Sequence, residues 1–409
     1  MKKLMIFAAI AALTLASCAK IENSAPTKET AVPIGFTNYA PKQLTKANDT
    51  YAPSTELIAS KQFAVYSYAT TNGTEFATSS LSALGTKFMD RVAVTFTDNN
   101  DNGANNDYSP RRYWPSGDTP DWLTFWAYYP VESSAGIATN PTNGINYTAP
   151  TGSNGLGSFV FTAASTPATM VDFMVADVVN DKIYGTTSGE HIAVNGEVPF
   201  TFRHQLAKIR CQFKTDLDPA TDATTKVVLT SAELQKVNTV GTLSATYNVS
   251  ASPATQTSWG SQGTPSTYAV TIGGSAIDNN VLTTTLVGGE NADLFLMIPQ
   301  ETLVNTDANA QKLVITWDVK TFDSSTNANA ATAATATTVG NDGLLSITHN
   351  SAVLFLDDVT VKDGDTTKSN DWAKNQFTTY AITIGPKPIL FTATVQPWDS
   401  ETTGTINVQ

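Results

Sequence analysis

The sequence contains few of the residues that build most catalytic and metal centres. Its 409 residues include only two cysteines and three histidines. None of the histidines has a second histidine at metal-ligand spacing. No carboxylate pair and no Gly-rich phosphate loop stands out. We therefore expect no enzymatic activity, no catalytic residues and no cofactor, and a secreted hydrolase is the least favoured of the functions considered.

The chain is also poor in charge. Charged residues make up 15% of it, and the formal net charge is −12. An acidic surface repels phosphate backbones, so no nucleic-acid partner is expected. Few charges together with abundant Thr, Ala, Asn and Ser are typical of extracellular β-proteins.

The N-terminus has the features of an export signal. Lys2 and Lys3 precede an apolar run from Leu4 to Leu15, which is too short to span a bilayer. The four residues ending at Cys18 read Leu-Ala-Ser-Cys and resemble the bacterial lipobox, in which the cysteine is acylated. We expect residues 1–17 to be a signal peptide and Cys18 to carry acyl chains such as palmitate, which anchor the chain to the membrane. The alternative is an ordinary signal with an incidental cysteine.

Apolar and polar residues alternate with a period of two, and long amphipathic helices are missing. This pattern predicts an all-β protein built from antiparallel β-sandwiches. The alternating stretches lie at 32–37, 92–96, 159–161, 198–206, 270–272, 313–319, 353–361 and 389–396.

The alternation changes parity near Ala207 and Lys208. Such a change predicts a bulge or bend in one strand, because a slip of one residue exchanges its two faces. His204 lies on the apolar side before the change, and we expect it to be buried and bonded to a backbone group. Cys211 lies on the apolar side after it, and we expect a small buried core residue.

The length allows two domains. We place the boundary near Gly189 to Gly196, with a tether at 18–30, an N-terminal domain at 31–194 and a C-terminal domain at 195–409.

One loop resembles a calcium site. Residues Asp98 to Gly103 match the start of an EF-hand loop, but the twelfth position is Ser109 where a bidentate glutamate is needed. A solvated Asn/Asp turn is the simpler interpretation, so no metal site is predicted.

A group of aromatic residues suggests a sugar-binding platform, because aromatic faces stack on sugars. Alternate residues of a strand point to opposite faces, so we expect at least half of the group to serve the core. The group comprises Trp114, Trp122, Trp126, Tyr128 and Tyr129.

Several segments together resemble the fimbrillin-like proteins of Bacteroidetes. Each is weakly specific alone, but their order covers nearly the whole chain. They are Tyr113-Trp114-Pro115, Leu123 to Pro130, Asp172 to Ala176, Val198 to Ile209 and Val395 to Asp399.

The resemblance implies two transthyretin-like β-sandwich domains in an exported lipoprotein. In many members a protease removes the first strand at a basic residue, and a neighbouring subunit's strand fills the groove by donor-strand exchange. Applied here, the removable first strand contains Val32, Ile34 and Phe36. No arginine precedes Arg91, so the basic candidates for cleavage are Lys42, Lys46 and Lys61. Lys46 is the expected site, because it lies in a polar loop just after the first strand, and an ordinary solvated lysine is the alternative.

The C-terminal tail is the expected donor strand, because Ile406 and Val408 alternate with polar residues. A terminal strand paired within its own domain is the alternative. The implied function is a structural or adhesive subunit of a fimbrium at the cell outer membrane and cell surface. Its partners would be other pilin subunits, and a host glycan or protein ligand stays open, as does stalk versus tip. A monomeric glycan-binding surface lipoprotein is the alternative function.

Overall fold

The computed structural model confirms the all-β sandwich fold. Among the described residues, the one helix is α3 (Ala330–Thr335). The structure describes residues 31–39, 62–76, 86–95, 108–131, 144–148, 155–167, 170, 172–217, 222–248, 250–252, 255–270, 276–277, 294–326, 328, 330–363, 365–385 and 390–397.

The described strands form three sheets, and the first holds the N-terminal strands. Its order is β1 (Gly35–Tyr39), β10 (Glu197–His204), β7 (Met174–Ala176), β4 (Trp122–Tyr129), β2 (Gln62–Thr70) and β3 (Thr86–Thr95). Two further strands, β8 (Val179–Gly185) and β9 (Ile192–Val194), extend it from β4.

The other two sheets pack face to face as a sandwich. One has the order β17 (Leu344–Phe355), β16 (Lys312–Phe322), β12 (Thr225–Tyr247), β6 (Gly155–Thr162) and β5 (Gly144–Thr148), with β13 (Thr255–Ala269) and β14 (Ala276–Ile277) on β12. The other has the order β15 (Leu294–Met297), β11 (Ala207–Thr215), β20 (Gln376–Ile384), β21 (Leu390–Pro397), β18 (Val361–Asp363) and β19 (Thr366–Lys368).

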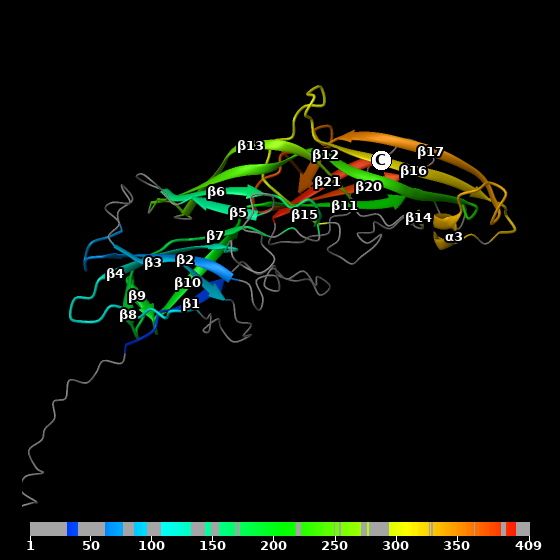
Figure 1. The fold of residues 1–409 in the computed structure, drawn as a ribbon. Coiled ribbons are helices and arrows are strands. Elements are labelled where there is room, and N and C mark those ends of the chain that lie inside the picture. Colours follow the sequence, from blue (N-terminus) through cyan, green and yellow to red (C-terminus); the bar gives the residue numbers. More distant parts are fainter. Residues whose placement is uncertain are drawn as a thin grey trace, which may run out of the picture.

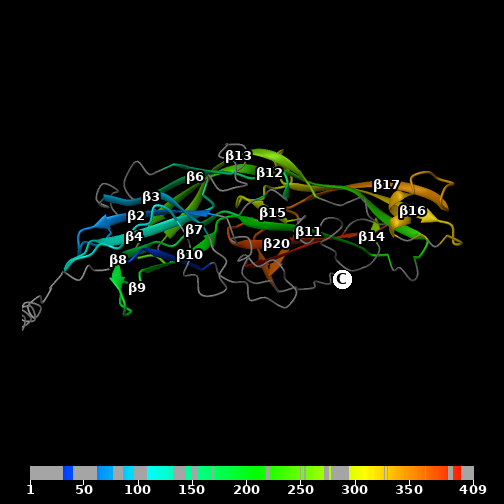
Figure 2. The same cartoon turned by 60° about the horizontal axis from the view of Figure 1, so that its bottom comes forward.

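Most of the described strand pairs are antiparallel. The 23-residue β12 pairs with strands from both halves of the chain. Its first part pairs with β16, and its last part pairs with β6 from the N-terminal half of the chain. Among the strands that the structure describes, four pairs are parallel, namely β1 with β10, β8 with β9, β11 with β20 and β18 with β21. Figures 1 and 2 show an elongated molecule with the first sheet at one end and β16 and β17 at the other.

The central strands of the first sheet are buried on both faces. On β4, Trp126 and Tyr128 join the core that β6 covers, whereas Phe125 and Ala127 join a second core beneath β1 and β10. Alternate side chains point to opposite faces, so a continuous apolar run supplies two cores at once.

The parity change marks a switch between sheets. The chain leaves the first sheet after His204 and enters another at Ala207, so the residues before and after Gln205 and Leu206 belong to two strands. The predicted bulge in one strand is therefore replaced by a crossing from one core to the next. The predicted domain boundary between residues 194 and 195 stays a prediction.

Candidate functional site

The first strand, residues 32–39, lies between backbone segments on both of its sides, at 112–114 and 197–201. We call this site the seat of the first strand. Along one side, β1 pairs in parallel with β10, from Gly35 opposite Glu197 to Tyr39 opposite Thr201. On the other side, the Ile34 amide donates to the Arg112 carbonyl at 2.9 Å. The Trp114 amide donates to the Val32 carbonyl at 3.0 Å. The chain therefore pairs with residues 112–114 through Val32 to Ile34, and with β10 through Gly35 to Tyr39.

The side chains of the first strand fill this seat. Ile34 and Phe36 are fully buried, while the intervening Gly35 is only partly buried. The Phe36 ring stacks on Phe200 at 5.7 Å between centroids, with the planes 13° apart. It also contacts Phe63, Tyr108 and Phe125 at 6.3, 5.4 and 6.1 Å. Burying an apolar side chain of this size stabilises a fold by roughly 1.5–3 kcal/mol.

Tyr108 closes the seat, and the sequence analysis did not identify it. Its hydroxyl donates to the Ile34 carbonyl at 3.0 Å, and the Arg112 amide donates to the same hydroxyl at 3.2 Å. A tyrosine hydroxyl is protonated at physiological pH, and burial raises the pKa of Tyr108 further. The nearest segment that the sequence analysis identified is Tyr113-Trp114-Pro115, which begins five residues later.

The other predicted processing and assembly residues lie outside the described residues. They are Cys18, Lys46, Ile406 and Val408, and the possible calcium loop Asp98 to Gly103 also lies there.

The aromatic group is part of the protein interior. Trp114, Trp126, Tyr128 and Tyr129 are each at most 5% exposed. Trp122 is partly buried and stacks on His191, with 4.3 Å between the ring centroids. These residues form no solvent-facing row, so the prediction that at least half of them serve the core is confirmed.

His204 is buried as predicted, but its partner differs from the prediction. Its Nδ1 lies 2.6 Å from Oδ2 of Asp172, a carboxylate instead of a backbone group. The reason is that β7 pairs with β10, and Met174 lies opposite His204. The residue two positions before Met174 is thereby brought beside the imidazole. Cys211 is 1% exposed and lies in the core, as expected.

Within the described ranges, the structure contains no group of three His, Cys, Asp or Glu residues that could hold a metal ion. No helix in the part of the chain that the structure describes is both long and apolar enough to cross a membrane.

Solved structures share the fold of the chain. A fimbrial protein from Bacteroides vulgatus is similar with a TM-score of 0.54 at 17% identity, covering 90% of this chain and 99% of its own. The tip fimbrial protein Mfa3 from Porphyromonas gingivalis, with a C-terminal truncation, has a TM-score of 0.35 at 10% identity, covering 83% and 94%. Only the first likeness exceeds a TM-score of 0.5, and at this identity it shows the fold alone.

The sequence itself gives the family. None of the curated proteins matches it significantly. The model of the fimbrillin-like family, however, matches residues 45–398, which is most of the chain. The chain therefore belongs to the fimbrillin-like family.

Proposed function

We propose that this chain is a structural or adhesive subunit of a cell-surface pilus that polymerises by strand exchange. In this proposal it is exported as a lipoprotein acylated at Cys18, and a protease cuts at Lys46 to release the first strand. The seat of β1 is the observation that supports the proposal. The strand is held by buried side chains and by backbone bonds, and its pairing partners come from residues 112–114 and 197–201, far along the chain.

Loss of the first strand would leave a groove with two kinds of unmet interaction. The apolar cavities that the side chains of Ile34 and Phe36 now fill would be empty. The edge of β10 from Glu197 to Thr201 would lose its backbone partner. An exposed edge of this kind is a template for another strand.

The proposed replacement is the C-terminal tail of a neighbouring subunit. Ile406 and Val408 are spaced two residues apart, as Ile34 and Phe36 are, so both could enter the vacated cavities. A contact between the tail of one subunit and the groove of the next is head-to-tail and does not close, so it builds a filament.

The proposal can be tested by attaching the first strand to its neighbour with an engineered disulfide. Pro33 and Tyr113 form an antiparallel bridge, and the two backbone bonds on either side of it make them a non-hydrogen-bonded pair. Such pairs have Cα atoms about 4.5 Å apart, which a disulfide can span. The double variant Pro33→Cys/Tyr113→Cys, in a Cys18→Ala background, keeps the strand attached after the chain is cut at Lys46.

We expect the cut, oxidised double variant to stay monomeric and to polymerise once the disulfide is reduced. The single variant Pro33→Cys is the control and should polymerise under both conditions. Size-exclusion chromatography and SDS-resistant ladders measure the outcome. Polymers from the oxidised double variant would show that strand removal is not required for assembly.

A further inference from the structure

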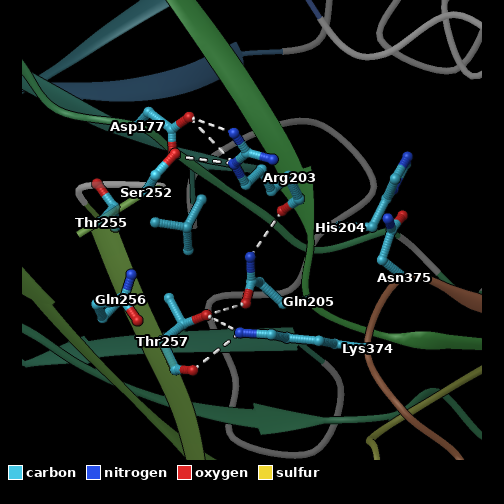
Figure 3. A pocket seen from close by; sticks show the side chains of 11 residues that line it. Asp177, Arg203, His204, Gln205, Ser252, Thr255, Gln256, Thr257, Lys374 and Asn375 are labelled. Carbon is cyan, nitrogen blue, oxygen red and sulfur yellow. Dashed lines mark hydrogen bonds and ion pairs between the residues drawn. The ribbon is translucent and has the colours of Figure 1, made fainter.

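A polar pocket of about 370 Å³ lies where the first sheet meets β13 and the loop before β20 (Figure 3). The side chains that matter for its chemistry are Arg203, Gln205, Gln256, Thr257, Lys374 and Asn375. Val175 is the one apolar residue of its lining. A ligand in this pocket is therefore recognised mainly by hydrogen bonds and charge, and the volume is at the small end of the range for small-molecule sites.

The two cations of the pocket have different partners. Arg203 is paired with Asp177, at 2.8 Å between Nη2 and Oδ2 and 3.0 Å from Nε to each carboxylate oxygen. Lys374 donates to the carbonyl and the hydroxyl of Thr257, at 2.9 and 2.8 Å, and both acceptors are neutral. Lys374 therefore presents a positive charge to the pocket, and both of these hydrogen bonds go to neutral acceptors. The chain as a whole has a net charge of −12.

The pKa of Lys374 is consistent with this arrangement. Although Lys374 is exposed overall, desolvation where its ammonium meets Thr257 lowers the pKa, and the nearby charge of Arg203 lowers it further. A bound anion would oppose both effects by stabilising the ammonium. Because the hydrogen bonds of Arg203 go to Asp177, Lys374 is the cation positioned to bind a ligand, and one ammonium suits a carboxylate better than a phosphate dianion.

Lys374 is held in position before any ligand arrives. The Thr257 hydroxyl accepts from Lys374 and donates to Oε1 of Gln205 at 2.7 Å, and Gln205 in turn donates to the Arg203 carbonyl at 2.8 Å. The next residue, Asn375, has a left-handed backbone (φ 59°), and its amide donates to the Leu206 carbonyl at 3.0 Å. The loop that carries Lys374 is therefore held against the connection between β10 and β11. This reduces the conformational entropy that the loop loses when a ligand binds.

We infer that this pocket binds one sugar unit carrying a carboxylate, with Lys374 recognising the carboxylate and Gln256 and Asn375 recognising hydroxyl groups. Side-chain amides donate and accept, as sugar hydroxyls do. Thr257 is a positioning residue that orients Lys374. The inference gives the adhesive role of the proposed function a ligand class. It is tested on single, uncut chains, so its outcome is separate from that of assembly.

The test is titration calorimetry on the uncut chain with Cys18→Ala. The probes are glucuronate, galacturonate and N-acetylneuraminate, with glucose, galactose and inorganic phosphate for comparison. We expect at least one acidic sugar to saturate the pocket, and its neutral counterpart or phosphate to bind at least about tenfold more weakly.

Variants locate the site. Lys374→Met should weaken binding about tenfold or more, because it removes the charge and keeps the stem. Lys368→Met, at an exposed position on β19 outside the pocket, should bind as the unaltered chain does. Thr257→Val should also weaken binding, and Thr257→Ser should restore it through the retained hydroxyl. A positioning role predicts that rescue, whereas a purely steric role does not.

Three results would overturn the inference. The first is that no acidic sugar binds up to about 10 mM. The second is that a neutral sugar or phosphate binds as tightly as every acidic sugar. The third is that Lys374→Met leaves binding unchanged.

Discussion

The imidazole of His204 and the carboxylate of Asp172 lie 2.6 Å apart, Nδ1 to Oδ2, at the point where β10 ends. Their side chains are 2% and 9% exposed. The pair joins β10 to the segment that leads into β7 just before the chain crosses from the first sheet to the next. A buried polar group that loses its hydrogen-bond partner destabilises the fold, because it has given up water and gained nothing in return. The fold should therefore be sensitive to loss of this contact between β10 and the segment before β7.

Asp172→Ala should lower the free energy of unfolding by about 1–3 kcal/mol, because the buried imidazole loses its acceptor. Asp172→Asn should cost less, since its side-chain oxygen can still accept. Asp118→Ala, at an exposed position, is the control and should change little. Urea unfolding measures all three, and an alanine variant as stable as the control would mean that the pair does not contribute.

Phe36 should matter for the uncut chain. Phe36→Ala leaves a cavity among Phe63, Phe125 and Phe200, and a loss of about 3–5 kcal/mol is expected. Val160→Ala is the control, because Val160 is 40% exposed on β6. Chemical unfolding of both variants checks this, and equal losses would show that the first strand contributes little to the fold.

Gly157 and Gly117 provide a matched pair for testing crowding. Their φ angles are 122° and 118°, so alanine meets the same backbone strain at both. A Cβ at Gly157 would lie 2.3 Å from Cε2 of Tyr147 and 2.8 Å from the Thr148 carbonyl oxygen, whereas nothing lies within 4 Å at Gly117. Gly157→Ala should therefore be less stable than Gly117→Ala by about 1–3 kcal/mol in thermal unfolding. Equal stabilities would mean that β5 moves aside without cost.

The sequence predicted many of the strands and their faces because these depend on local alternation. The predicted stretch at 353–361 was wrong, because β17 ends at Phe355, β18 begins at Val361, and Val353 is 52% exposed. The buried positions of β10 are Val198, Phe200, Phe202 and His204, as the period of two indicates. The fold class was predicted correctly for the same reason. The family was predicted correctly from the resemblance of short segments, most of which include residues of β4, β7, β10, β11 or β21.

Partners across the chain were less predictable. Nothing local to Phe159 and Phe161 indicates that β6 pairs with the end of β12, about 80 residues later. The partner of His204 and the role of Tyr108 also depend on contacts between distant segments. The pocket was missed for the same reason, because Lys374 meets Thr257 only after β13 and the β20 loop are folded together.

Lys320 is a buried cation whose contribution should depend on pH. It is 3% exposed on β16, and its Nζ donates to the carbonyls of Ala333 and Ala336 at 2.8 and 2.6 Å, at the end of α3. Lys320→Met keeps an unbranched apolar stem and removes both bonds. We expect faster amide hydrogen exchange in α3 of the variant, because the last carbonyls of the helix lose their donor.

The pH dependence follows from the pKa of Lys320, which burial lowers below the ordinary value of 10.5. Between the folded pKa and 10.5 the unfolded chain binds more protons than the folded chain, so raising the pH favours the folded state. The free energy of unfolding of the unaltered chain, minus that of Lys320→Met, should therefore rise across this window and stay flat below it. A fall with pH for Lys320 would mean that the ammonium is stabilised in the fold, and that its two carbonyl partners outweigh the cost of burial.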